Sequence, residues 1–235
     1  MKYRFLPVVL FFLFSFTTIN KSNTLSSKIT VASGSSTELE AVSLYRELKE
    51  NQFSLPTLNS FTEAIIGFYH LKEKGLVKKE ILTIVDFSLS SNTKRLWVID
   101  MVAHQVLMNT YVSHGKNTGE EFASSFSNEN SSFKSSLGFY STAEIYNGKH
   151  GLSLRLDGLE KGVNDKARER GIVMHAADYV SAEFIRSNKR LGRSQGCPAI
   201  PAELTPQIIE MIKGKSCLFV YHPSRTYTGD NKVVL

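Results

Sequence analysis

The sequence predicts a mainly β domain with helical additions, and three observations carry that prediction. Short segments rich in β-branched and aromatic residues recur from residue 80 onward, helical periodicity is confined to residues 38–74 and 202–213, and Gly, Asn or Pro separates many of the segments. β-Branched and aromatic side chains favour strands, whereas apolar residues spaced three or four apart favour helices. Many short strands with few helices indicate a β core that carries helical attachments.

The first 19 residues have the pattern of a secretory signal peptide. Lys2 and Arg4 precede an apolar stretch that ends at about Ile19, shorter than the ~20 residues that span a bilayer. No Ala-x-Ala cleavage site follows, so an uncleaved membrane anchor is the alternative. Both alternatives predict an exported protein of the periplasm or cell envelope. Residues 20–37, rich in Ser, Thr, Asn and Lys, are expected to be a flexible linker.

An N-terminal helical segment is predicted over residues 38–79. Apolar residues recur every three positions within Glu38–Glu50, and a second helical pattern covers Leu58–Lys74. Gly75 is a suitable residue to end this second helix, and Asn59 or Ser60 is a suitable N-cap. Two helices are therefore expected ahead of the β domain.

Residues 80–223 contain the predicted strands and one more helix, and a polar tail covers residues 224–235. The strand segments are Glu80–Leu89, Lys94–Met101, Gln105–Ser113, Leu137–Tyr146, Leu152–Leu156, Ile172–His175 and Cys217–Tyr221. The second and third should form a hairpin, and Asn147-Gly148 is the predicted turn between the fourth and fifth. Ser124–Ser136 is expected to be a loop, and Ala202–Lys213 a helix that Thr205 caps and Pro206 begins.

Charge and metal-ligand spacing exclude some classes of function. The formal net charge is +6, but the basic residues are interspersed with acidic ones, as in Lys161–Arg170, which is typical of a solvated surface. No nucleic-acid partner is therefore expected. No His-x-x-x-His or Cys-x-x-Cys spacing occurs, so neither a metal site nor a cofactor is predicted.

A cysteine and a histidine are the candidate chemical groups. Cys197 stands between Gly196 and Pro198, and His175 lies 22 residues upstream at the end of an apolar run. A thiol and an imidazole suffice for acyl transfer, because the thiolate attacks a carbonyl and the imidazole transfers the proton. The alternatives are a buried thiol in a turn and a core histidine. The second cysteine, Cys217, is expected to be buried in a strand, with a disulfide to Cys197 as the alternative.

The sequence around these two residues resembles the murein L,D-transpeptidase catalytic domain family. His175 begins the pattern His-x-Ala-x-Tyr-Val-Ser, and Gly192 begins Gly-Arg-Ser-x-Gly-Cys-Pro-Ala-x-Pro. These patterns resemble a divergent, YkuD-like branch with a Ser-x-Gly-Cys-Pro-Ala motif. The resemblance extends from about Val85 to Tyr221 and includes Arg95–Asp100 and Lys149–Gly158.

The resemblance implies a fold and a reaction. The family fold is a small β-sandwich or partly open barrel, here preceded by two helices. Members cleave the tetrapeptide stem of peptidoglycan before its terminal D-alanine and hold the acyl group on cysteine as a thioester. An amine of a second stem then takes the acyl group, giving a 3→3 cross-link, or water takes it, giving an L,D-carboxypeptidase. Peptidoglycan stem peptides are thus the expected partners, and carbapenem-type inhibitors are expected from the family.

The resemblance also implies roles for individual residues. Cys197 would be the nucleophile, His175 the general base and acid, and the Ala176 carbonyl the group that fixes the imidazole tautomer. The backbone N–H groups of Gly196 and Cys197 would stabilise the oxyanion. The candidate substrate-binding residues are Arg193, which could hold a stem carboxylate, Ser194, Gln195, Tyr140 and His150.

The chain departs from the better-known branch around both reactive residues, and Pro198-Ala199 stands where that branch has a polar or basic residue soon after the cysteine. Gln195 stands where that branch has a second histidine beside the nucleophile, and Ala176 replaces a glycine. A peptidoglycan L,D-transpeptidase is the function predicted. An L,D-carboxypeptidase and a non-catalytic cell-wall-binding module are the alternatives.

Overall fold

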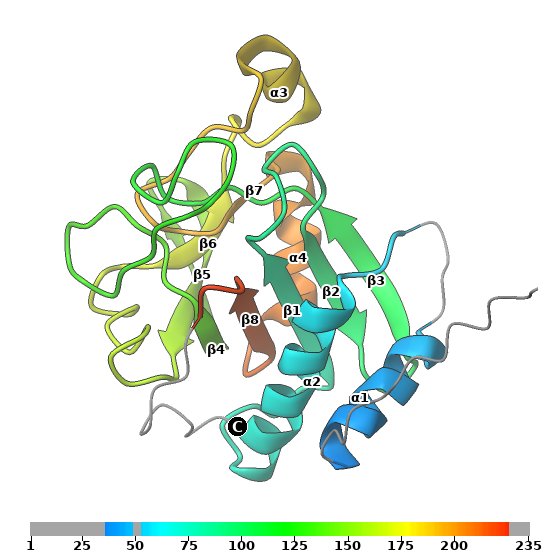
Figure 1. The fold of residues 1–235 in the computed structure, drawn as a ribbon. Helices are drawn as coiled ribbons and strands as arrows, with labels where there is room; N and C mark the ends of the chain where they lie inside the picture. The colour runs from blue at the N-terminus through cyan, green and yellow to red at the C-terminus, as the bar shows by residue number, and fades with distance from the viewer. Residues whose placement is uncertain (1–35, 49–52, 226–235) are drawn as a thin grey trace, which may run out of the picture. The chain divides into compact units, whose positions relative to one another are not determined.

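The computed structural model describes residues 36–48 and 53–225, and its eight strands form one sheet (Figure 1). The strand order is β3-β2-β1-β8-β4-β5-β6-β7. The strands are β1 (Ile81–Asp86), β2 (Leu96–Asp100), β3 (Gln105–Thr110), β4 (Gly138–Gly148), β5 (Gly151–Gly158), β6 (Val173–Ala176), β7 (Ala199–Ile200) and β8 (Cys217–Tyr221). The helices are α1 (Ser36–Glu47), α2 (Leu58–Glu73), α3 (Ala182–Asn188) and α4 (Thr205–Ile212), with a 3₁₀ turn η1 (Ala202–Leu204) before α4.

The sheet curls until its two edges meet at one point. Ser113, just beyond edge strand β3, forms an antiparallel bridge with Ala199 of the other edge strand, β7. The Ser113 N–H donates to the Ala199 carbonyl at 2.8 Å. A sheet whose two edges meet approaches the closure of a barrel. The result is a nearly closed barrel, which confirms the predicted mainly β fold with helical additions.

The two faces of the sheet belong to two hydrophobic cores. Along β8 the side chains alternate, because successive residues of a strand point to opposite faces. Leu218 and Val220 join the core that contains Ile208 of α4, whereas Cys217 and Phe219 join the core that contains Phe61 and Phe68 of α2 together with Tyr221. Figure 1 shows α2 and α4 on opposite sides of the sheet.

Helix α2 is tied to the sheet at its start. Its N-cap is Thr57, whose Oγ1 accepts a hydrogen bond from the Ser60 N–H and donates one to Asp86 Oδ2 at the end of β1. The predicted caps, Asn59 and Ser60, were therefore wrong, because a threonine two residues earlier also anchors the helix to a buried carboxylate. Gly75 follows the helix with φ +69°, as predicted for its end.

The turn between β4 and β5 lies further along the chain than predicted. Gly148 pairs with Gly151, so the two turn residues are Lys149 and His150 rather than Asn147 and Gly148. The hairpin therefore carries two basic side chains at its tip. The predicted capping of the last helix was also wrong, because η1 precedes α4 and the N-cap is Leu204, which places Thr205 inside the helix.

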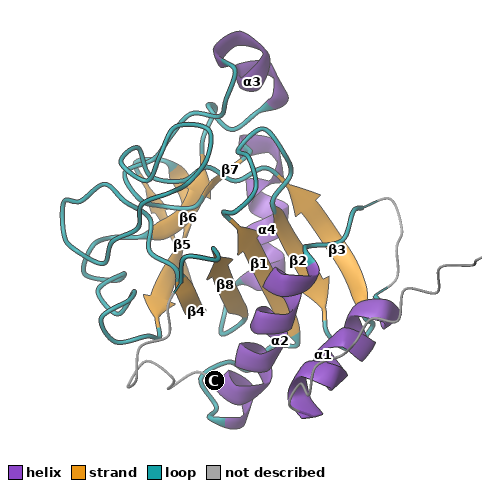
Figure 2. Cartoon of the chain, viewed as in Figure 1, coloured by secondary structure: helices purple, strands orange, loops and turns teal. Residues whose placement is uncertain are grey.

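Helix α3 and strand β7 were not predicted. Helix α3 has no buried residue, so its sequence lacks an apolar face, and it projects from the loops rather than packing on the sheet (Figure 2). Strand β7 is only two residues long, too short to give a periodic pattern. The predicted loop over Ser124–Ser136 is confirmed, since no helix or strand occurs there.

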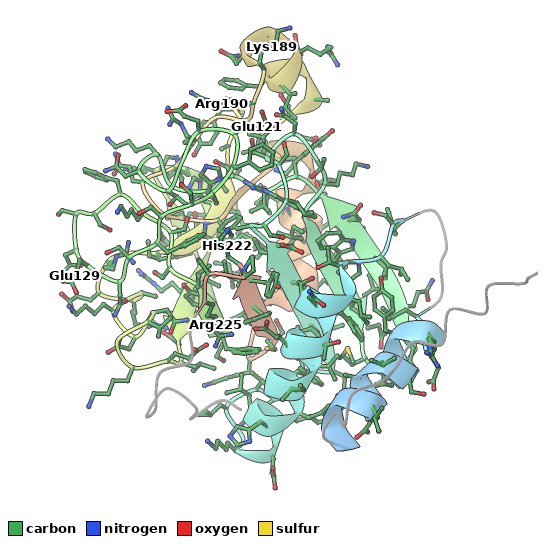
Figure 3. All side chains as sticks on the ribbon, viewed as in Figure 1. Glu121, Glu129, Lys189, Arg190, His222 and Arg225 are labelled. Atoms are coloured by element: carbon green, nitrogen blue, oxygen red, sulfur yellow. The ribbon has the colours of Figure 1, made fainter. Side chains whose placement is uncertain are left out.

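The chain that leaves β8 is held by a buried ion pair. Arg225 (Figure 3) contacts Glu160 at 2.5 Å, and its guanidinium also lies over the rings of Phe139 and Phe219. The predicted signal or anchor (1–19) lies outside the described residues, as do residues 20–35 of the predicted linker and 226–235 of the tail. Residues 36 and 37 belong to α1. Among the described residues, no helix has the length and apolar character that crossing a membrane requires.

Candidate active site

Cys197 sits on a short loop that enters β7, and Ser194 holds this loop closed. Ser194 Oγ donates to the Cys197 carbonyl at 2.6 Å and accepts from the Gly196 N–H at 3.0 Å. The Ser194 N–H in turn donates to the carbonyl of His114 at 2.9 Å. His114 is buried and accepts from the Arg95 guanidinium through Nδ1 at 2.8 Å. The cysteine loop is thus fixed from within and from the neighbouring segment.

The conformation of this loop requires glycine at position 196. The φ angle of Gly196 is +121°, which L side chains rarely adopt. A Cβ at this position would lie 2.8 Å from the Lys134 carbonyl oxygen and 3.2 Å from Ile172 Cδ1. The glycine therefore permits both the turn and the close approach of two backbone segments beside the thiol.

His175 lies in β6, and a backbone bond fixes its tautomer. Its Nδ1 is 2.7 Å from the carbonyl oxygen of Ala176. A carbonyl only accepts, so Nδ1 carries the proton and Nε2 of the neutral ring is the basic nitrogen. His150, at the β4–β5 tip, stacks on the His175 ring with centroids 4.2 Å apart and planes 18° from parallel. The ring is therefore held both at its edge and across its face.

Strand register brings the thiol and the imidazole to one cavity. β6 and β7 run parallel with His175 opposite Ala199, so Cys197, two residues before Ala199, lies beside the start of β6. The Val173 N–H lies 3.5 Å from the Cys197 sulfur, and the thiol lies 3.8 Å from the Gly171 carbonyl. Cys197 and His175 both line a cavity of about 490 Å³.

The two reactive groups are both neutral near pH 7. Burial raises the pKa of the Cys197 thiol above its ordinary value of 9.0, and the Val173 N–H and the charges of Arg170 and Lys149 only partly oppose this. Burial lowers the pKa of His175 below 6.5, against the bond to Ala176. A neutral thiol and a neutral imidazole in one cavity suit general-base activation during attack better than a preformed ion pair.

The cavity wall is basic and aromatic. It comprises Ser131, Phe133, Tyr146, Lys149, His150, Ser153, Arg170, Gly171, Ile172, Val173, His175, Tyr179, Arg193, Ser194, Gln195 and Cys197. No aspartate or glutamate is among these described lining residues. Such a wall favours an anionic ligand.

The predicted substrate-binding residues fall into two groups. Arg193, Ser194, Gln195 and His150 all line the cavity. Tyr140 does not. It is buried in the barrel core and its hydroxyl donates to the Ser136 carbonyl at 3.0 Å, so it is unavailable to a ligand there. The structure therefore shows Tyr140 packed in the core and not on the cavity wall.

The Gly196 N–H, a predicted oxyanion donor, has an acceptor inside the protein. It donates to Ser194 Oγ in this structure. An N–H that is already bonded stabilises a developing charge only if that bond shifts toward the charge. The role predicted for Gly196 therefore depends on Ser194 releasing it.

Two cations at the site were missed by the sequence analysis. Arg170 lies at the end of the charged run that indicated a solvated surface, yet its half-buried guanidinium donates to the carbonyls of Ser127 and Lys134. Lys149 stands in the Lys149–Gly158 segment that carried the family resemblance. Because the turn was predicted on Asn147-Gly148, Lys149 was not expected at the tip of the hairpin.

Cys217 lies apart from this site. It is fully buried in the core between the sheet and α2, whereas Cys197 packs against the other core, which contains Ile208 of α4. Both thiols are free. The expectation of a buried cysteine in a strand is confirmed, and the alternative disulfide is excluded in this structure.

Comparison with known proteins identifies the family. The family model of the L,D-transpeptidase catalytic domain matches residues 54–221. No curated protein matches the chain. Among solved structures, an L,D-transpeptidase from Mycobacterium smegmatis shares 15% identity at a TM-score of 0.39, with 61% of this chain and 59% of that chain covered.

Two further solved structures resemble the chain. The helical cell shape determining protein Pgp2 from Campylobacter jejuni shares 12% identity at a TM-score of 0.38, covering 72% of this chain and 59% of that chain. The L,D-transpeptidase LdtMt1 in complex with imipenem shares 12% identity at a TM-score of 0.38, covering 60% and 59%. At these values the assignment rests on the family model, which matches well over half of the sequence. The chain therefore belongs to the L,D-transpeptidase catalytic domain family.

Proposed function

We propose that this protein is an exported peptidoglycan L,D-transpeptidase that forms 3→3 cross-links through a thioester on Cys197. The family assignment supports an acyltransferase that acts on peptidoglycan, outside the cytoplasm. Residues 1–19, with the pattern of a signal peptide or anchor, support export. We extend this proposal to inhibition by carbapenems, which the family resemblance implies.

One observation carries the catalytic assignment. The Ala176 carbonyl fixes the proton of His175 on Nδ1, so Nε2 is basic in a cavity that the Cys197 thiol shares. This arrangement meets the requirement for a nucleophile, a base and a group that orients the base.

The proposed first half-reaction forms the acyl-enzyme. As the Cys197 sulfur attacks the carbonyl carbon before the terminal D-alanine, its proton passes to His175 Nε2, and the carbonyl oxygen becomes an oxyanion. The Cys197 N–H and, once released by Ser194, the Gly196 N–H are the proposed donors to that oxygen. His175 then protonates the leaving amine, the C–N bond breaks, and a thioester and free D-alanine remain.

The second half-reaction returns the enzyme to its resting state. The amine of a neighbouring stem attacks the thioester carbon and loses a proton to His175 Nε2. The C–S bond then breaks, the thiolate takes that proton, and a new amide joins the two stems. Water in place of the amine would give a carboxylate and a shortened stem.

Product analysis tests the proposal. Purified disaccharide-tetrapeptide is incubated with the full chain and, in parallel, with a Cys197→Ala variant, and the products are identified by mass spectrometry. A cross-linked dimer that lacks one D-alanine, absent with the variant, supports the transpeptidase. Tripeptide without dimer would replace it by the carboxypeptidase. Unchanged substrate would replace it by a non-catalytic wall-binding module.

A further inference from the structure

The cavity wall has one lysine and two arginines and, among its described residues, no acidic side chain. The cations are Lys149 on the β4–β5 tip, Arg170 before β6, and Arg193 on the cysteine loop. They differ in whether a carboxylate of the protein already pairs with their charge and whether other protein groups already accept their hydrogen bonds. That difference identifies which cation is available to a ligand.

Arg170 is occupied by the protein itself. One terminal nitrogen donates to the Ser127 carbonyl at 2.8 Å and to Ser136 Oγ at 2.7 Å. The other donates to the Lys134 carbonyl at 2.6 Å and to Ser132 Oγ at 3.3 Å. This guanidinium holds the 127–136 loop against the site, so its contribution to a ligand is its charge rather than a free hydrogen bond.

Arg193, the predicted carboxylate anchor, already has a carboxylate. Its Nη1 lies 2.6 Å from Glu120 Oε1 and also donates to the carbonyls of Lys116 and Gly119 at 3.3 Å. A substrate carboxylate that bound Nη1 would have to displace Glu120. The charge of Arg193 is therefore already paired in this structure, whereas that of Lys149 has no ion-pair partner among the described residues.

Lys149 is exposed, and no carboxylate lies within ion-pair distance of it in the described part of the chain. Its neighbour His150 stacks on His175, so the lysine stands at the edge of the reactive groups. Lys149, His175 and Cys197 all line the same cavity. The hairpin tip thus presents, to the cavity that the thiol also lines, one positive charge without an ion-pair partner among the described residues.

We propose that Lys149 binds the terminal carboxylate of the stem peptide and thereby selects stems that end one residue beyond the bond to be cleaved. This assignment rests on the proposed function. In a tetrapeptide stem the carboxylate of the leaving residue lies only about 3.5 Å along the chain from the attacked carbonyl. A cation on the wall of the cavity that holds the thiol is therefore a suitable group to bind it, and an ammonium binds a carboxylate through charge-assisted hydrogen bonds. A stem with a further residue would carry its carboxylate away from the lysine.

The test compares the kcat/KM values of one enzyme for two substrates that differ only in the terminal carboxylate. The kcat/KM of the full chain is measured for release of the last residue from a tetrapeptide with a free C-terminal carboxylate and from the same peptide with a C-terminal carboxamide. Wild type should prefer the free acid by about tenfold. Lys149→Gln should abolish this preference, whereas Lys149→Arg should keep it. The matched control is Lys161→Gln, which removes an exposed lysine that does not line the cavity.

The ratio of the two substrates separates carboxylate binding from other effects of the lysine. A change in the pKa of Cys197 or His175 alters both rates equally and leaves the ratio unchanged. An unaltered preference in Lys149→Gln, or a preference lost in Arg193→Gln instead, would overturn the assignment while the proposed function stands. No turnover of the free acid by wild type would overturn the proposed function and this assignment with it.

Discussion

Replacement of Gly196 by alanine should damage both the cysteine loop and the reaction. At φ +121° an alanine is strained, and its Cβ would lie 2.8 Å from the Lys134 carbonyl oxygen. Strain of this kind costs roughly 1–3 kcal/mol. Since each kcal/mol lowers the Tm of a protein of this size by roughly 2–4 °C, we expect a fall of several degrees. The loop must also shift to relieve the contact, and a displacement of about 1 Å at the nucleophile lowers kcat/KM about 100-fold.

Gly214→Ala is the matched control for this variant. Gly214 also has a positive φ, +76°, but a Cβ there would meet no atom within 4 Å. We expect a comparable or smaller loss of Tm, measured by thermal unfolding, with kcat/KM for tetrapeptide unchanged. If Gly196→Ala keeps a kcat/KM within threefold of Gly214→Ala, the argument that glycine shapes the cysteine loop is refuted.

Three further predictions concern the thiol and the imidazole. The kcat/KM should rise with pH through the pKa of His175, which lies below 6.5. The rate of alkylation of Cys197 by iodoacetamide should still increase with pH above 9.0, because the pKa of the thiol is raised. An alkylation rate that has already reached its plateau at pH 7 would indicate a preformed ion pair. Ser194→Ala removes both hydrogen bonds that close the cysteine loop, so it should lower the free energy of unfolding by about 1–3 kcal/mol and slow acylation by a carbapenem. Wild-type values of both quantities would contradict the role of Ser194. His150→Ala should lower kcat by up to about tenfold, because a ring stack is worth ~0.5–1.5 kcal/mol. His150→Phe keeps an aromatic ring and should restore kcat. A phenylalanine variant as slow as the alanine variant would show that stacking on His175 does not support the reaction.

The sequence predicted the elements that bury a regular apolar pattern. Cys217–Tyr221 was predicted to the residue, because all five side chains are buried and two cores take them alternately. Helix α3 escaped prediction because none of its residues is buried. The start of α2 was predicted less accurately. Its N-cap, Thr57, bonds to Asp86, which is distant in the sequence, and local patterns do not reveal such a contact.

The candidate site was only partly predictable for the same reason. The motif identified Cys197 and His175, but the partners that occupy Arg193 and Arg170 come from loops far away in the sequence. Tyr140 has the residue type of a binding group, but it lies in the core and its hydroxyl is bonded to the Ser136 carbonyl. Lys149 was missed because the turn was placed on Asn147-Gly148.

The central claim is that Cys197 carries the acyl group, and intact-mass spectrometry with peptide mapping tests it most directly. Wild-type full chain is mixed with tetrapeptide stem and quenched at short times in acid. If Cys197 carries the acyl group, the spectra will show an adduct equal to the substrate less one D-alanine. The adduct should map to Cys197, be absent from the Cys197→Ala variant and never occur on Cys217. Turnover without an adduct on Cys197, or turnover by the Cys197→Ala variant, would contradict it.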